Sequence, residues 1–310
     1  MKPTPFLLAR SAPLPVRDGV GPSCVALPVG RWTTMLEFLL ARFPAISLAI
    51  WQARMAAGDV VDEDGRTVGV DDAFRAPLRL YYYRDARAIS AEAAPPTDEE
   101  VLHHDAHLLV VDKPHFLAVT PSGPYLQQSL LVRLRRRLGI DELAPLHRLD
   151  RDTAGVMLFS TNVASRGTYQ ALFTRRAIDK RYEAIVHWHD GATLPSRRQS
   201  RIVEAARFPL MCEIPGTTNA ETRFELGEIL ESHALLYLEP ITGRKHQLRL
   251  HCAALGMPIV NDRMYPQLCP PGPDDHAKPL RLLARSIAFV DPLTGEGRKF
   301  SSARSLACAA

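Results

Sequence analysis

Apolar residues recur with a helical period near the start of the chain. The apolar positions of the first periodic stretch are Met35, Phe38, Leu39 and Phe43. Their spacings of three, one and four predict an amphipathic helix that ends near Pro44. A second helix is predicted from Ser47 to Ala57, with Gly58 as its stop. Short strands are expected around the Glu-Asp-Gly turn that follows.

These patterns divide the chain into four parts. Residues 1–30 are rich in Pro, Gly and Ser and show no period, so they are predicted to be an N-terminal extension. Residues 31–87 form the small α+β module just described. Residues 88–98 have the Ala, Pro and acidic composition of a linker. Residues 99–310 are left for one larger domain.

The larger domain alternates short apolar runs with few helical stretches. Strands are predicted at the runs "LLVVDKP", "GVMLFS" and "KRYEAIVHW", at 219–225 and 234–241, and twice in the tail from 281. Helices are predicted at 128–138, from an N-cap at Asn162 to Arg175, and after Gly243 up to Gly256. Strands outnumber helices without regular βαβ alternation. The sequence therefore predicts an α+β fold with a mixed, mainly antiparallel sheet and flanking helices.

Composition changes this picture only slightly. The chain has 310 residues and a formal net charge of +4, and residues 1–98 hold 11 basic and 11 acidic side chains. The excess positive charge therefore lies in the larger domain, which is compatible with an anionic partner such as RNA. No apolar run has the roughly 18 residues that a membrane span needs. Five scattered cysteines and the absence of a signal-peptide pattern favour free thiols in the cytoplasm.

Two carboxylates, Asp150 and Asp152, stand among basic residues in the stretch "PLHRLDRDTAGVMLFS". Arg148 and Arg151 flank Asp150, and a nearby cation favours the ionised carboxylate that acts as a nucleophile or base. Structural salt bridges are the competing explanation of such a cluster.

Two other segments offer partners for Asp150. On the helix after Gly243, His246 and Arg249 are three positions apart and share a face. Tyr182 offers an aromatic ring with a hydroxyl, although a packing tyrosine on a strand would look the same. An ionised Asp, an Arg and a Tyr suit chemistry on a flipped nucleotide.

Four ordered segments, "LLVVDKP", "HRLDRDTAGVMLFS", "KRYEAIV" and "TGRKHQLRLHCAALGMPIVND", resemble the motifs of RluA-type RNA pseudouridine synthases. The resemblance runs from about residue 99 to 303 and implies the pseudouridine synthase catalytic sheet. It also implies isomerisation of uridine to pseudouridine in ribosomal or transfer RNA, without a cofactor. Residues 31–87 resemble the small RNA-binding domain that often precedes this catalytic domain, but they lack its basic recognition pattern.

The resemblance assigns roles to individual residues. Asp150 matches the nucleophile, Tyr182 the tyrosine that stacks on the target base and assists proton removal, and Arg249 the arginine that pairs with the aspartate. Arg148 matches an arginine that fills the gap left by the flipped uridine. The remaining matched neighbours, with substrate-binding roles, are Lys245, His246 and Leu250. Asp152 is expected to be a loop or capping residue.

The chain departs from the family pattern at Ala154, where Ser or Thr is usual, and at the pair His115-Phe116 after "DKP". Two basic stretches leave alternatives open. The arginines Arg133, Arg136 and Arg137 are expected either on a solvated helix face or against RNA phosphates. The stretch "PSRRQSRIV", 195–203, is expected to be an exposed basic loop or an RNA contact.

Other function classes are less well supported by the sequence. A non-catalytic RNA-binding or RNA-chaperone protein on the same scaffold is the main alternative, but binding alone needs no Asp150, Tyr182 and Arg249 together. A glycosidic hydrolase would need two separated carboxylates. The pair His103 and His107 suggests a metal site, but no third ligand is evident, so none is predicted. A monomer is expected.

Overall fold

The computed structural model describes residues 12–84, 98–122, 125–270 and 272–306. The described chain divides into two compact units. The first contains the described residues up to 84 with the short segments 125–127 and 135–141, and the second contains the remainder. Most of the predicted linker, residues 88–97, lies outside the described residues.

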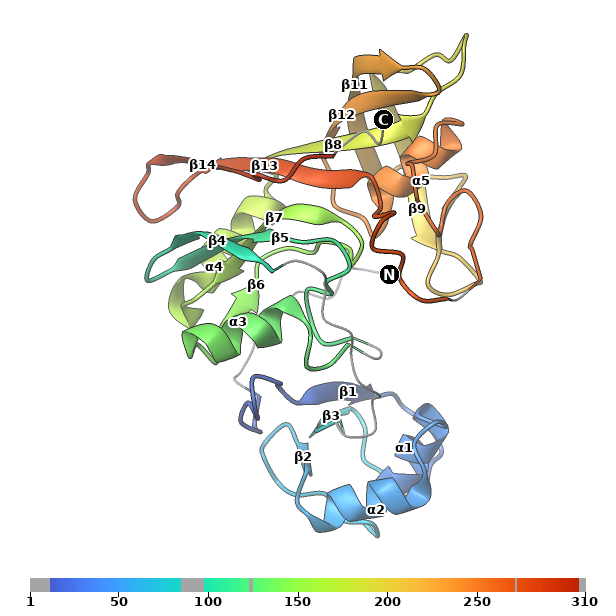
Figure 1. The fold of residues 1–310 in the computed structure, drawn as a ribbon. Helices are drawn as coiled ribbons and strands as arrows, with labels where there is room; N and C mark the ends of the chain where they lie inside the picture. Colours follow the sequence, from blue (N-terminus) through green and yellow to red (C-terminus); the bar gives the residue numbers. More distant parts are fainter. Residues whose placement is uncertain (1–11, 85–97, 123–124, 271, 307–310) are drawn as a thin grey trace. The chain divides into compact units, whose positions relative to one another are not determined.

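The first unit is a small sheet covered by two helices (Figure 1). Its elements are β1 (Ser23–Leu27), α1 (Met35–Arg42), α2 (Leu48–Ala56), β2 (Val60–Asp62) and β3 (Leu78–Tyr82). The strands are antiparallel in the order β1-β3-β2. The predicted N-terminal extension, residues 1–30, contains β1, and every residue of this strand pairs with β3.

Both predicted helices of the first unit begin at a capping side chain. The Thr34 hydroxyl accepts a hydrogen bond from the Glu37 N–H, and the Glu37 carboxylate accepts one from the Thr33 N–H. Ser47 caps α2 through the Ile50 N–H. These caps satisfy backbone donors that the first helical turn leaves open. The core residues of this unit include Met35, Phe38, Leu39, Trp51, Met55 and Leu80.

The second unit is built on one large sheet of eleven strands. Its strands are β4 (Glu100–His104), β5 (Leu108–Lys113), β6 (Ala144–Pro145), β7 (Ala154–Ser160), β8 (Asp179–His187), β9 (Arg197–Glu204), β10 (Met211–Ile214), β11 (Ala220–Leu230), β12 (His233–Pro240), β13 (Leu282–Val290) and β14 (Gly297–Ser301). The order is β10-β9-β11-β12-β8-β13-β7-β5-β4, with β14 on β13 and β6 on β7. The pair β13–β7 is parallel and the other pairs are antiparallel. The predicted mixed, mainly antiparallel sheet is confirmed.

Three helices belong to this part of the chain: α3 (Leu130–Leu138), α4 (Val163–Thr174) and α5 (Gln247–Ala254). In Figure 1, α3 and α4 lie beside the β4–β5–β7 end of the sheet, and α5 lies beside β8, β9 and β12. Leu248 and Cys252 of α5 pack in one core cluster with β8 and β12 residues such as Val186 and Leu236. Helices thus pack beside both halves of the sheet, and β13 lies between the two halves.

The stretch expected to be a basic loop is instead mostly strand β9, which pairs with β10 and β11. Arg197, Gln199 and Arg201 are exposed on one face, while Ile202 on the other face is buried. The sequence analysis did not recognise β9 as a strand because most of its residues are polar. The apolar residues that pack on it come from distant elements and not from its own sequence.

Gly155 shows why small residues precede the apolar residues of β7 in the sequence. Its φ is +112°, and a Cβ built on it would lie 2.2 Å from the carbonyl oxygen of Ala284 on β13. A side chain there would break the parallel β7–β13 contact. Ala154, the departure from the family pattern, is fully buried opposite Leu283. Small residues at these two positions therefore bring the loop that precedes β7 close to β13.

Candidate active site

The residues of interest converge on the loop between β6 and β7. The loop turns at Asp150, whose carbonyl oxygen accepts a hydrogen bond from the Thr153 N–H at 3.2 Å. The Asp150 side chain is largely buried, with 16 % exposed. A carboxylate placed there is shielded from most solvent but remains open to a substrate.

His147 holds the start of this loop against β7. The Leu158 N–H donates to His147 Nε2 at 3.1 Å, so the ring proton lies on Nδ1, which faces the Arg148 carbonyl oxygen at 3.3 Å. The ring also stacks on Phe173 of α4, with centroids 5.0 Å apart. Burial lowers the pKa of His147 to about 4, so the ring is neutral near pH 7. Its role is to position the backbone that leads into Asp150.

Lys113, the last residue of β5, holds the far side of the loop. It is fully buried, and its ammonium donates to the carbonyl oxygens of Pro114 and Leu117 at 2.9 Å and of Arg151 at 3.0 Å. Burial lowers the pKa of Lys113 to about 7, against the opposing charges of Asp152 and Asp150. The "DKP" segment therefore ties β5 directly to the residue that follows Asp150.

Arg249 reaches Asp150 from α5. Its Nη1 lies 3.9 Å from Asp150 Oδ2, and its side chain is 2 % exposed. The same guanidinium donates to Asp262 through Nε at 2.8 Å and Nη2 at 2.6 Å. Burial opposes the charge on Arg249, but the hydrogen bonds and charge of Asp262, together with Asp150, raise the pKa of Arg249 above its usual value. A fixed cation therefore faces the Asp150 carboxylate.

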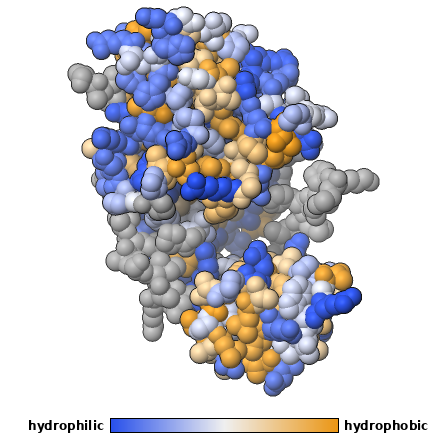
Figure 2. All heavy atoms as spheres, turned by 90° about the vertical axis from the view of Figure 1, so that its right-hand side faces the viewer, coloured by the Kyte–Doolittle hydropathy of each residue, from blue (hydrophilic) through white to orange (hydrophobic). Residues whose placement is uncertain are grey.

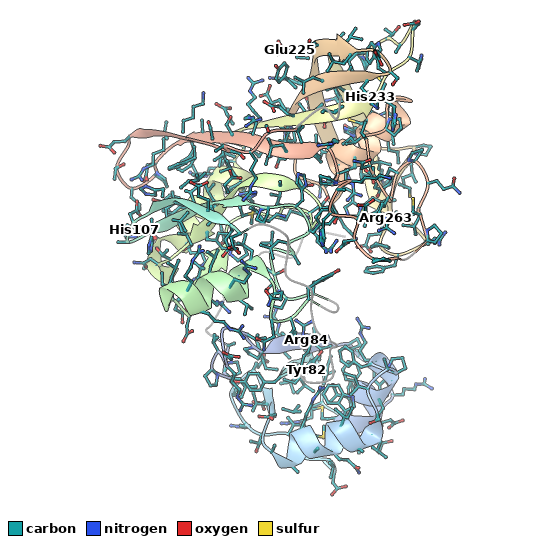
Figure 3. All side chains as sticks on the ribbon, in the orientation of Figure 1. Tyr82, Arg84, His107, Glu225, His233 and Arg263 are labelled. Carbon is teal, nitrogen blue, oxygen red and sulfur yellow. The ribbon has the colours of Figure 1, made fainter. Side chains whose placement is uncertain are left out.

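Asp262 belongs to this group of charges, and the sequence analysis did not single it out. Its Oδ1 also accepts hydrogen bonds from the N–H groups of Met264 and Tyr265, at 2.8 and 3.1 Å. The two-pronged pair with Arg249 fixes the guanidinium plane. The signal was present, because Asp262 is the last residue of the segment that matched the arginine motif. In Figure 3 its neighbour Arg263 is labelled in the loop close to α5.

Arg148 and Tyr182 complete the surroundings of Asp150. Arg148 Nη2 lies 3.8 Å from Asp150 Oδ1 and the Arg148 side chain is 58 % exposed, so it can leave the carboxylate without a large packing loss. Tyr182 lies on β8, paired with Leu238 and Ala284. Burial, and then the charge of Asp150, raise the pKa of Tyr182 well above its usual value. Tyr182 is therefore a neutral phenol.

His246 precedes α5 in the left-handed region, with φ of 55°. Its Nδ1 lies 3.0 Å from the Tyr265 hydroxyl. Burial lowers the pKa of His246 to about 4, although the Asp150 charge opposes this shift. His246 is thus a neutral group beside two cations, Arg249 and Lys245.

Lys245 and Leu250 face the β9–β10 hairpin. The Lys245 ammonium lies 5.2 Å from the centroid of the Phe208 ring. Leu250 packs against Ile202 and Met211 of the same hairpin. The structure therefore brings Asp150, Arg148, Arg249, Tyr182 and His246 into one electrostatic group, and it gives Lys245 and Leu250 contacts of a different kind.

Asp152 has a separate environment from Asp150. It pairs with Arg151 at 2.8 Å, and its carbonyl oxygen accepts a hydrogen bond from His115 Nδ1 at 2.7 Å. Arg151 also pairs with Asp274. His115, a departure from the family pattern, thus supports the loop, and Asp152 is engaged in holding it.

The two histidines considered for a metal have other contacts. His103 pairs with Asp105 at 2.8 Å, and His107 Nδ1 lies 3.1 Å from the Ser165 hydroxyl. Figure 3 places His107 at the opposite end of this unit from Arg263, which follows Asp262, the partner of Arg249. A search of the described residues finds no cluster of three or more potential metal ligands.

The family model and the relatives that match this chain all belong to one family. The family model described as RNA pseudouridylate synthase matches residues 107–254, which include Asp150, Tyr182 and Arg249. The dual-specificity RNA pseudouridine synthase RluA of Pasteurella multocida is 33 % identical over 222 residues, covering 67 % of this chain and 95 % of that protein. RluA of Escherichia coli K12 is 31 % identical, covering 65 % of this chain and 91 % of its own length.

A solved structure agrees with this result. Human RNA pseudouridylate synthase domain containing 4 superposes with a TM-score of 0.52 at 27 % identity, covering 70 % of this chain and 89 % of that one. No helix in the described part of the chain is long and apolar enough to cross a membrane.

Proposed function

Because the chain belongs to the RluA-type family of RNA pseudouridine synthases, isomerases that act on uridine in RNA, we propose that Asp150 is its nucleophile. The supporting observation is the buried chain of charges Asp150–Arg249–Asp262, in which Asp262 fixes Arg249 and Arg249 faces Asp150. The family match, the relatives and the solved structure confirm the predicted fold and enzyme class, while the residue roles are our proposal.

The reaction breaks the bond between ribose C1′ and uracil N1 and forms a bond from C1′ to C5. A transient covalent bond to an Asp150 oxygen holds the intermediate while the base turns. The C5 hydrogen leaves as a proton and N1 takes up a proton, so the reaction is an isomerisation and consumes no co-substrate. Neither a metal nor a cofactor is required by this scheme.

The other residues have positioning and binding roles in the proposal. Arg249 places positive charge beside the reacting carboxylate. Tyr182, as a neutral phenol, stacks on the target base and offers a hydrogen bond, and it does not start as a phenolate base. Arg148 is the mobile cation at the site, and it takes the space that the flipped uridine leaves in the RNA. His246 adds a neutral wall to this pocket.

The two alternative classes fit the geometry less well. A hydrolase of glycosidic bonds needs a second carboxyl group as acid or base. The nearby carboxylates are both occupied, since Asp262 binds Arg249 and two backbone N–H groups and Asp152 binds Arg151. A protein that only binds RNA gains nothing from desolvating Asp150 beside an arginine that is itself fixed.

We also propose a ribosomal or transfer RNA target, a monomeric enzyme and a cytoplasmic location. The described cysteines Cys24, Cys212, Cys252 and Cys269 are free thiols, which supports a reducing compartment. Mapping pseudouridine in total RNA from cells with and without the gene identifies the target.

The nucleophile is tested with total RNA labelled with tritium at uracil C5, taken from cells that lack the gene. Wild-type protein releases tritium as C5 becomes the glycosidic carbon. Asp150→Asn is expected to lose more than about 10⁴-fold in rate, because no other carboxylate can replace it, while RNA binding and thermal stability persist. Asp152→Asn is the matched control and should stay within about tenfold of wild type, since only a loop ion pair is lost. An active Asp150→Asn variant would refute the mechanism.

A further inference from the structure

The hairpin that joins β9 to β10 carries an unusual side chain at its tip. The tip is closed by hydrogen bonds from the Ala205 N–H to the Leu210 carbonyl oxygen and from the Leu210 N–H to the Arg207 carbonyl oxygen, both at 3.0 Å. Phe208, in this turn, is 87 % exposed. Exposed apolar residues are common on protein surfaces. Figure 2 shows hydrophobic residues among hydrophilic ones on one face of this protein. Exposure alone therefore assigns no role.

The position of the hairpin relative to the active site gives Phe208 its interest. The Tyr265 hydroxyl accepts a hydrogen bond from the Met211 N–H at 2.8 Å and lies 3.0 Å from His246 Nδ1. The Tyr265 ring also lies 5.8 Å from the Arg249 guanidinium carbon. Leu250 of α5 packs on the base of the hairpin. The hairpin therefore contacts the same helix and loop that contain Arg249 and Asp262.

Phe208 is also held from one side by a cation. The Lys245 ammonium lies 5.2 Å from the ring centroid, within the range of a cation–π contact. This contact orients the ring without burying it, so much of its surface stays open. An exposed aromatic plane beside a positive charge is suited to a flat ligand that carries an anionic backbone.

The charge of the hairpin favours nucleic acid over a protein partner. The segment from Arg197 to Leu210 holds four arginines and a single acidic residue, Glu204. Arg197 and Arg198 pair with Glu221 and Glu213. The Arg207 side chain is exposed beside Phe208 and makes no ion pair with any described residue. A cation next to an exposed ring matches one phosphate and one base of a single-stranded segment.

We propose that Phe208 stacks on an unpaired RNA base that flanks the target uridine, with Lys245 on the ring and Arg207 at the adjoining phosphate. This inference rests on the proposed function, because it places the substrate RNA at Asp150. Unpaired bases are the features by which proteins usually recognise RNA sequence or loop shape. The hairpin tip is thus a substrate-selecting element outside the catalytic group.

Single-turnover tritium release is measured at increasing enzyme concentration, with the same C5-labelled total RNA, for Phe208→Ala, Phe208→Leu and Phe208→Trp. Loss of one base-stacking contact is expected to raise the half-saturating enzyme concentration about tenfold in the Ala and Leu variants. Phe208→Trp should remain near wild type, and the maximal rate should be unchanged in all three. Tyr237→Leu removes an exposed aromatic from β12 and is the matched control, expected to be silent. Thermal melting checks folding, which an exposed side chain should hardly affect.

The outcomes separate this inference from the proposed mechanism. If Phe208→Leu saturates like wild type, the ring does not stack and the inference is overturned. A lower maximal rate with unchanged half-saturation also overturns it. An inactive Asp150→Asn variant that binds a fluorescent single-stranded oligouridylate as wild type does, together with weaker oligouridylate binding by Phe208→Leu, supports both proposals. If Asp150→Asn remains active while Phe208→Leu still binds weakly, only the mechanism fails.

Discussion

Helices α3 and α5 are both short and basic, but α5 buries polar residues as well as apolar ones, whereas α3 buries only apolar residues. In α3 the buried side chains are Leu130, Leu131, Val132 and Leu134. In α5 they include Gln247, Arg249 and His251. Helices in globular proteins usually bury an apolar stripe, as α3 does. The buried polar groups of α5 cost desolvation energy unless each finds a partner, and Leu248 and Cys252 are its only buried apolar residues.

The partners of the arginines show the same contrast. Arg133 of α3 was expected to point outward, but its side chain is 19 % exposed and pairs with Glu99 at 2.9 Å and with Asp98. It thereby joins α3 to the edge of β4. Arg249 of α5 is held by Asp262 and faces Asp150. Identical residue types thus serve packing in one helix and, in our proposal, chemistry in the other, and only the partners distinguish them.

Among changes to these two helices, the largest effect is expected from breaking the Arg249–Asp262 pair. Arg249→Lys keeps a positive charge but loses the two-pronged contact that fixes this charge beside Asp150, and the single-turnover rate should fall by about 10²- to 10³-fold. It also leaves Asp262 incompletely paired, so the free energy of unfolding should drop by about 3 kcal/mol. Asp262→Asn keeps the Arg249 charge but loosens its position, and a smaller loss of rate is expected.

The rate of tritium release and chemical denaturation check these variants. If Arg249→Lys reacts at the wild-type rate, the fixed guanidinium is not required, and the distinction between α5 and α3 loses its functional meaning.

An effect of intermediate size is expected when pH is lowered, because buried His251 of α5 makes the free energy of unfolding depend on pH. Burial lowers the pKa of His251 to about 4, against an opposing effect of Glu213, while the unfolded value is about 6.5. Between these values the unfolded chain binds a proton that the folded chain does not. The free energy of unfolding should therefore fall as pH falls from about 6.5 to 4, by up to about 1.4 kcal/mol per pH unit for one such histidine.

Urea denaturation at several pH values measures this slope. His251→Gln can keep hydrogen bonds to the hydroxyls of Thr222 and Ser200, which the wild-type ring meets at 2.9 and 3.0 Å. The variant should show a shallower slope than wild type, and His115, His147 and His246 should supply the remainder. Equal slopes would mean that His251 titrates alike in both states.

The smallest effect on catalysis is expected from α3. Arg133→Gln removes an ion-pair partner of the buried Glu99 carboxylate, so the free energy of unfolding should fall by about 1–3 kcal/mol. The maximal rate and the half-saturating enzyme concentration should not change, because the wild-type side chain is engaged within the protein. Weaker RNA binding with a reduced salt dependence would instead show that Arg133 contacts RNA phosphate.

The sequence by itself determined the elements whose signals are local. The periods and caps around Thr34, Ser47 and Asn162 specified α1, α2 and α4, because a helix is formed from contacts three or four residues apart. Ordered motifs specified the family and pointed to Asp150, Tyr182 and Arg249 as one group. The apolar runs of β5 and β7 specified strands that are buried on both faces.

Only the tertiary structure determined which strands pair and which side chains contact one another. Strands β1 and β9 carry little apolar alternation of their own and form because β3, β10 and β11 supply their partners. The role of Asp262 depends on its contact with Arg249, thirteen residues away along the chain. The burial of Lys113 depends on carbonyl groups from two segments. Ion pairing and desolvation are set by long-range neighbours, and for that reason they separate Asp150 from Asp152 where composition does not.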